Sequence, residues 1–107
     1  MNWELRYHPE AEKDLKKLDG SQLLLVRKAI KKVQMNPLPE EEGGYGKPLG
    51  NRRGRDLTGL MKIKLKKAGI RVVYQLVRTK TQMLVIVVGV REDEEVYDLA
   101  EKRLGKS

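Results

Sequence analysis

The sequence has no cysteine and only one histidine among its 107 residues. The absence of cysteine excludes disulfide bonds and thiolate nucleophiles, and it fits a reducing cytoplasm. A single histidine also excludes a pair of histidines acting as general acid and base. No apolar run approaches the ~20 residues of a membrane-spanning helix, and the N-terminal stretch is too polar for a signal peptide. We therefore expect a cytoplasmic protein with no membrane partner.

The chain is short and strongly basic. Its 107 residues suffice for one modest core, so we predict a single domain over residues 1–107. Lys and Arg total 23 against 15 Asp and Glu, a net charge of +8 that favours a nucleic-acid partner. The stretch 47–71 holds nine basic residues and one acid, whereas 92–101 holds six acids. The alternative is that these runs are simply solvated faces.

Hydrophobic periodicity predicts the order strand, helix, helix, strand, strand, strand, helix. We expect strands at 3–7, about 57–65, 70–77 and 83–90, with the last strand central and covered on both faces. Helices are expected from Pro9 through Leu18, from a Ser21 cap to Asn36-Pro37, and over about 93–103. The predicted fold is α+β, with a mainly antiparallel four-stranded sheet (β-α-α-β-β-β-α), a helical hairpin packed on one face and a short C-terminal helix. Residues 37–56, rich in proline and glycine, are predicted to form an exposed loop.

Basic side chains alternate with apolar ones along the segment MKIKL, residues 61–65. Strand geometry turns Lys62 and Lys64 to one face, about 7 Å apart. Arg71 on the next strand is expected to join them, and Arg91 follows the last strand. A phosphodiester would neutralise such a set of cations.

The residue types point to lysine chemistry on RNA. Cleavage needs a base for the 2′-hydroxyl, neutralisation of the phosphorane and a proton for the leaving oxygen. We interpret His8 as a capping or surface residue, and we expect no metal and no cofactor because the nearby acids lack a ligand-like arrangement. Crowded cations lower the pKa of a lysine amine, which lets it act as a base. The alternative is a salt-bridged sheet face, but the sequence indicates too few nearby acids.

Tyr97 is expected to present its ring to a base, and Tyr74 to lie in the core.

Three segments together resemble a known family. They are HPEAEKDLKKLD at 8–19, KIKLKKAGIRVVYQL at 62–76 and VIVVGVREDEEVYDLAEKRL at 85–104. They resemble the RelE-type toxins of the RelE/ParE toxin–antitoxin superfamily, over nearly the whole chain. The resemblance implies a metal-independent mRNA interferase that enters the ribosomal A site and cleaves mRNA by attack of the 2′-hydroxyl on the adjacent phosphate. It also implies three partners: a cognate antitoxin, the ribosome with its rRNA, and mRNA.

The resemblance further implies a role for each residue of the site. Lys64 would be the general base, and Lys62 and Arg71 would hold and neutralise the phosphate. Arg91 would stabilise or protonate the leaving group, and Tyr97 would stack on the nucleotide. Contacts with RNA or the ribosome are expected from the other basic residues of the stretch 47–71, which are Lys47, Arg52, Arg53, Arg55, Lys66 and Lys67. The stretch 92–95 is more acidic than the basic stretch of some relatives.

Two other functions compete with this interpretation. A ParE-like toxin would block DNA gyrase without cutting RNA, although such relatives generally lack the full set of lysines, arginines and tyrosine. A non-catalytic RNA- or ribosome-binding module would use the same face electrostatically. For a toxin, we expect an antitoxin whose acidic or amphipathic segment covers the basic face or displaces the C-terminal helix.

Overall fold

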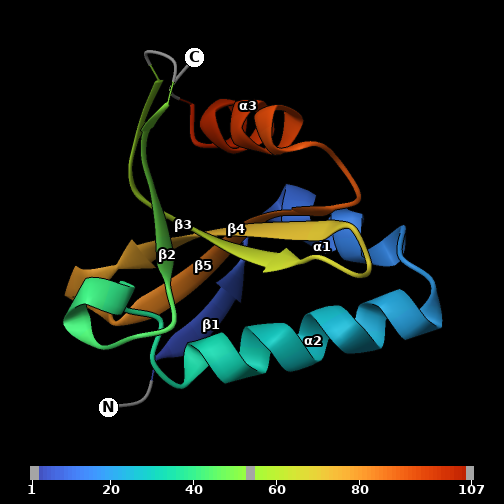
Figure 1. Cartoon of the computed structure of the whole chain (residues 1–107), viewed down its shortest axis with the longest axis horizontal. Coiled ribbons are helices and arrows are strands. Elements are labelled where there is room, and N and C mark those ends of the chain that lie inside the picture. The colour runs from blue at the N-terminus through green and yellow to red at the C-terminus, as the bar shows by residue number, and fades with distance from the viewer. Residues whose placement is uncertain (1–2, 53–54, 106–107) are drawn as a thin grey trace.

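The computed structural model describes residues 3–52 and 55–105 and shows an α+β fold around one sheet (Figure 1). The strands are β1 (Glu4–Tyr7), β2 (Lys47–Arg52), β3 (Arg55–Leu65), β4 (Ile70–Val77) and β5 (Gln82–Gly89). The helices are α1 (Pro9–Lys16), α2 (Gly20–Gln34) and α3 (Asp93–Arg103), and short 3-10 turns lie at Glu40–Glu42 and Arg78–Lys80. The predicted α+β class is confirmed.

The observed sheet differs in two respects from the predicted mainly antiparallel sheet of four strands. The sheet has five strands in the order β1-β5-β4-β3-β2, and its edge strand β1 pairs parallel with β5. The additional strand is β2, which lies in the segment predicted to be a loop. Pro48 and Gly50 suggested a loop, but an edge strand tolerates proline because its N–H need not pair. The register shifts between these two residues, where Gly50 adopts a left-handed φ of 64°.

The side chains of the residues immediately before α1 and α2 cap these two helices. The Nδ1 atom of His8 accepts a hydrogen bond from the Glu10 N–H at 3.1 Å, which confirms the interpretation of His8 as a cap. Helix α2 is capped by Asp19 and not, as predicted, by Ser21. Asp19 Oδ1 accepts from the Gln22 N–H at 2.8 Å and the Gln22 side chain accepts from the Asp19 N–H at 3.0 Å, which completes a capping box.

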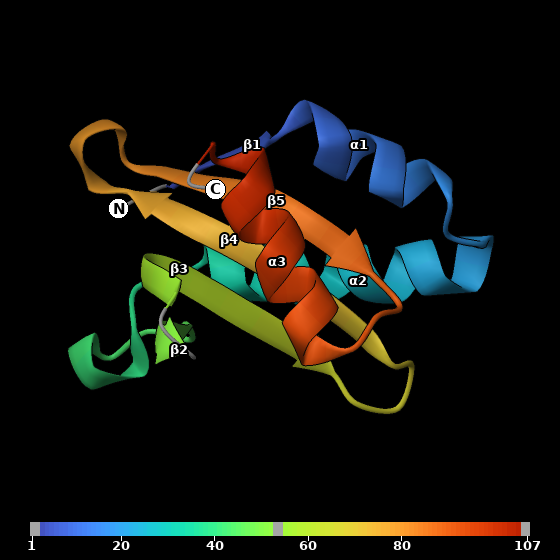
Figure 2. The same ribbon diagram turned by 90° about the horizontal axis from the view of Figure 1, so that it is seen from above.

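The sheet separates two apolar cores. Helices α1 and α2 cover one face and α3 crosses the other (Figures 1 and 2). On the α3 face the buried residues are Leu49, Leu57, Leu60, Val73, Ile86, Val87, Val96, Tyr97 and Ala100. Strand β5 contributes to both cores, as predicted for its nearly uninterrupted apolar run. A register shift in the β4–β5 ladder at Val73/Tyr74 lets consecutive Ile86 and Val87 join the α3 core.

A buried ion pair joins α1, β5 and α3. Arg103 Nη1 lies 2.7 Å from Asp14 Oδ2, and the two side chains are only 11% and 7% exposed. Asp14 Oδ2 also accepts the Val88 N–H at 3.0 Å, while Arg103 donates to the Ile86 carbonyl at 2.9 Å. Because the pair is further hydrogen-bonded to the strand, its burial leaves these charges well satisfied. The contact fixes the C-terminal end of α3.

We predict that Arg103→Met destabilises the protein by roughly 3 kcal/mol, because it leaves the Asp14 carboxylate buried without its partner. Urea unfolding of the purified protein measures the change. Lys102→Met removes the same charge from an exposed neighbouring position and serves as the control. Equal free energies of unfolding for the two variants would show that the buried pair stabilises the protein no more than an exposed charge does.

Candidate functional site

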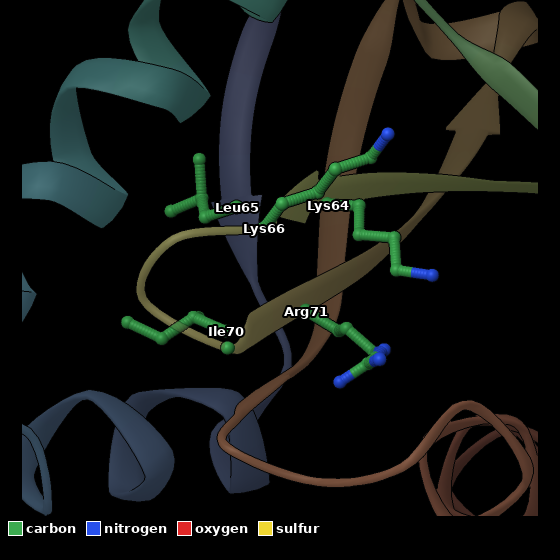
Figure 3. A pocket seen from close by; sticks show the side chains of 6 residues that line it. Lys64, Leu65, Lys66, Ile70 and Arg71 are labelled. Atoms are coloured by element: carbon green, nitrogen blue, oxygen red, sulfur yellow. The ribbon is translucent and has the colours of Figure 1, made fainter.

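The β3–β4 hairpin brings the predicted cations together. Lys64 lies directly opposite Arg71 in the ladder, and Lys62 lies opposite Val73. Residues opposite one another in an antiparallel pair share a face, so Lys62, Lys64 and Arg71 all project to the α3 side. Figure 3 shows Lys64 and Arg71 extending to one side of the hairpin and Leu65 and Ile70 to the other. The expected face is therefore correct, but α3 occupies part of it.

A hollow of about 270 Å³ lies at this end of the hairpin (Figure 3). Its lining residues are Lys64, Leu65, Lys66, Gly69, Ile70 and Arg71. The lining thus combines three cationic residues with the apolar residues Leu65 and Ile70. Such a surface suits an anionic group attached to an apolar or aromatic one, as in a nucleotide.

Asp93, the first residue of α3, contacts two of these cations. Its Oδ1 accepts a hydrogen bond from Arg71 Nε, and its Oδ2 lies 3.6 Å from Lys64 Nζ. The side chains of Lys64 and Asp93 are each 33% exposed, and that of Arg71 is 20% exposed. Asp93 therefore supplies a counter-charge that the sequence analysis did not assign to these cations. Residues 92–95 are distant in sequence from the hairpin, but α3 returns them to the same face.

The neighbouring cations keep Asp93 ionised. Burial is the largest single influence and would raise the pKa of its carboxyl, but the hydrogen bond and charge of Arg71 and the charges of the two lysines together outweigh it. The charges of Lys64 and Lys62 act in the same direction, so the pKa of Asp93 lies below its ordinary value of 3.8. Lys62, whose side chain is half-buried, is therefore close enough to influence the same carboxylate.

Arg91 lies beside the cluster but points to another acid. Its Nη1 is 3.5 Å from Glu95 Oε2, one helical turn further on. Arg71 donates a hydrogen bond to the Arg91 carbonyl and pairs in the ladder with Gly89. A Cβ atom on Gly89 would make only an ordinary van der Waals contact with the Arg91 side chain, at 3.5 Å. The sequence did not single out Glu95 as the partner of Arg91, since it carries no signal for this role.

Tyr97 does not lie where we expected. Its side chain is 1% exposed and packs in the core between α3 and the sheet, so its ring does not face solvent. The sequence suggested that Tyr97 is offset from the packing face formed by Val96 and Leu99. In the structure Val96, Tyr97 and Ala100 form that face, while Leu99 lies at its margin. Tyr74 is buried as predicted, and its hydroxyl donates to the Pro37 carbonyl at 2.9 Å.

The remaining predicted RNA contacts fall into two groups. Lys47 is exposed and lies opposite Lys62 in the β2–β3 ladder, so it extends the cationic face, and Lys66 and Lys67 are exposed in the β3–β4 turn. Arg52 pairs with Arg55 at the other end of the β2–β3 hairpin, about 30 Å along the strand from Lys64. Arg53 lies outside the described residues.

The described residues, 3–52 and 55–105, offer neither a cluster of metal ligands nor a membrane-spanning helix. No three His, Asp or Glu side chains among them gather closely enough to hold a metal ion. None of their helices has the length and apolar character needed to cross a membrane.

The ion pairs of Asp93 predict a pH-dependent contribution to stability. Since its folded-state pKa is depressed, the contribution is present above pH 3.8 and is lost as the pH falls through the folded-state pKa. Asp93→Asn removes this contribution at every pH. The difference in free energy of unfolding between wild type and variant should therefore be largest near pH 7 and shrink in acid. Urea unfolding at several pH values measures it, and a constant difference would contradict the ion pairs.

The chain is similar to characterised toxins along nearly its whole length. The family model described as ParE toxin of the type II toxin–antitoxin system parDE matches residues 5–97. A RelE-like toxin protein of Escherichia coli is 30% identical over 104 residues, which are 97% of this chain and 99% of the relative. The mRNA interferases RelE of Escherichia coli and Shigella flexneri are each 33% identical with the same coverage.

Solved structures show the same fold. A double mutant of the E. coli toxin RelE in the free state superposes with a TM-score of 0.75 at 32% identity, covering 97% of this chain and 99% of that one. The toxin in the intact E. coli RelBE toxin–antitoxin complex gives a TM-score of 0.66 at 29% identity, with coverage of 84% and 98%. The fold, the family model and the full-length relatives agree. The chain belongs to the RelE/ParE family of toxins from type II toxin–antitoxin systems.

Proposed function

We propose that this toxin is a ribosome-dependent mRNA endonuclease that uses the cations of the β3–β4 hairpin and needs no metal for the chemical step. One observation carries the proposal. Lys64 and Arg71 hold the two oxygens of a single carboxylate, Oδ2 and Oδ1 of Asp93. A phosphodiester also presents two negatively charged oxygens, so the same two cations suit it. The relatives named mRNA interferase RelE support RNA as the substrate.

The residues divide the chemical tasks by position. Lys64, in its neutral form, takes the proton from the 2′-hydroxyl, whose oxygen then attacks the adjacent phosphorus. Arg71 and Lys62, on the same face, neutralise the charge that develops on the phosphorane oxygens. The bond to the 5′-oxygen then breaks, and we assign Arg91 to stabilise this oxygen or to protonate it. Arg91 must turn away from Glu95 to do so. Tyr97 receives no substrate contact, because it is buried in the core.

The ribosome supplies the orientation that this site lacks. The hollow at the hairpin is shallow and leaves a third of the Lys64 side chain exposed, so it does not enclose a nucleotide. Fixing the 2′-hydroxyl in line with the phosphate contributes a large part of such a rate enhancement. An mRNA held in the A site of a cytoplasmic ribosome meets this need, with Lys47, Lys66 and Lys67 contacting RNA backbone. The second partner is a cognate antitoxin, as in the solved RelBE complexes.

We predict that Lys64→Met lowers the rate of mRNA cleavage on programmed ribosomes by roughly 100- to 10,000-fold, the usual contribution of a general base. Lys28→Met removes the same charge from an exposed position of α2, on the other side of the sheet, and should keep nearly full activity. Mapping of mRNA ends measures both rates.

The same pair of variants separates the competing functions. The family model bears the ParE name, which favours a gyrase inhibitor as the second candidate. For a gyrase inhibitor, Lys64→Met would leave the block of DNA supercoiling intact. For a non-catalytic RNA-binding module, the wild type itself would leave mRNA uncut and the variant would only bind more weakly.

The chemistry of the cut ends identifies the nucleophile and distinguishes the 2′-hydroxyl from a metal-activated water. Attack by the 2′-hydroxyl should leave a 2′,3′-cyclic phosphate and a 5′-hydroxyl, and a 2′-deoxy nucleotide at the cut position should abolish cleavage. Attack by a metal-activated water would instead release a 5′-phosphate and tolerate the deoxy substitution. Mass spectrometry of the RNA fragments distinguishes these products.

A further inference from the structure

We propose that Asp93 is an internal competitor of the substrate, whose carboxylate occupies the phosphate position on Lys64 and Arg71 and must leave before RNA can bind. The inference rests on the proposed function of the site, because it identifies the anion that the site holds when RNA is absent. It concerns a residue that has no role in the chemistry itself.

The contacts of Asp93 differ from those of the other ion pairs near the surface. Glu10 with Lys13 and Glu42 with Arg78 each join one acid to one well-exposed cation. Asp93 instead bridges cations from two strands, and it does so with a different oxygen to each. Its side chain and that of Lys64 are two-thirds buried, so solvent screens these contacts less than it screens an exposed pair. Asp93 thus matches the charge and the paired oxygens of a bound phosphodiester.

Asp93 and a phosphate cannot occupy this position together. The Nε donor of Arg71 is already used by Asp93 Oδ1, and two anions at hydrogen-bond distance from the same cations would repel one another. Asp93 in its observed position therefore opposes the binding of the substrate.

Release of the carboxylate does not require α3 to leave the sheet. The core residues Val96 and Ala100 anchor the helix, and Arg103 binds Asp14 at its far end. Asp93 is the first residue of α3, so rotation of its side chain is enough to free the two cations. The cations that act on its carboxylate are Lys62 and Lys64 on β3 and Arg71 on β4. Arg91, which precedes α3, pairs with Glu95 in the first turn of the helix.

The test compares anion binding by the full wild-type chain with that by three variants. Asp93→Asn keeps the shape and the amide oxygen but removes the charge, whereas Asp93→Glu keeps a carboxylate. Asp98→Asn makes the same change in net charge at an exposed position of α3 and controls for general electrostatics. The probes are inorganic phosphate, followed by chemical-shift titration, and a short RNA with a 2′-deoxy nucleotide at the cut position, followed by fluorescence anisotropy.

Asp93→Asn should bind both probes about fivefold more tightly than wild type, the effect of removing one partly screened ion pair. Asp98→Asn should change binding by less than twofold, and Asp93→Glu should stay close to wild type. Unchanged or weaker binding by Asp93→Asn would overturn the inference. An equal gain from Asp98→Asn would also overturn it, because net charge would then explain the effect.

Failure of this inference is distinguishable from failure of the proposed function. If Lys64→Met abolishes cleavage but Asp93→Asn binds no more tightly, the nuclease stands and Asp93 is not a competitor. If Asp93→Asn binds phosphate more tightly while Lys64→Met still cleaves mRNA, Asp93 does occupy an anion site, but that site is not the nuclease centre.

Discussion

The buried ion pair between Asp14 and Arg103 fixes the position of α3, and the candidate site depends on that position. Helix α3 lies across the face of the sheet that carries the cations, and the pair holds its C-terminal end against β5 and α1. The other end begins with Asp93 at Lys64 and Arg71. The helix is therefore attached at both ends by charge and along its middle by apolar packing. One attachment is deeply buried, and the other is open enough to exchange with a ligand.

The acidic first turn of α3 compensates for unfavourable charge placement in the sheet. Lys47 lies opposite Lys62, and Lys64 opposite Arg71, and like charges directly across a ladder destabilise it. Asp93 and its acidic neighbours bring negative charge to this face, and at a helix N-terminus they also interact favourably with the helix dipole. The negative charge that offsets repulsion between these cations in the folded toxin thus also opposes the binding of its substrate.

Much of the fold followed from local sequence patterns, because those patterns dominate where an element is flanked by strong turn signals. Strand β4 and helix α3 have the predicted bounds, Ile70–Val77 and Asp93–Arg103. The parallel partner of β1 was not predictable, since periodicity shows that a strand exists and not which strand lies beside it. Strand β2 was hidden by Pro48 and Gly50, which local signals assign to loops although an edge strand accepts them.

The candidate site, like the fold, could be predicted from the sequence only in part. The shared face of Lys62, Lys64 and Arg71 was predictable, because alternation along two strands of a hairpin fixes it. The counter-charge of Asp93 and the burial of Tyr97 were not, because both depend on which side of the sheet α3 returns to and on its rotation about its own axis. The first turn of α3 holds three acidic residues in a row, so its sequence does not show which of them faces the sheet. Only tertiary packing decides this.

The parallel pairing of β1 with β5 also determines the order in which the toxin can assemble during its synthesis. Residues 4–7 leave the ribosome long before their partners, residues 82–85. Until those emerge, the nascent chain holds an unpaired strand, and Asp14 waits still longer for Arg103. Contacts so distant in sequence form late because closing the long intervening loop costs entropy. The fold is therefore completed only after Arg103 has emerged from the ribosome.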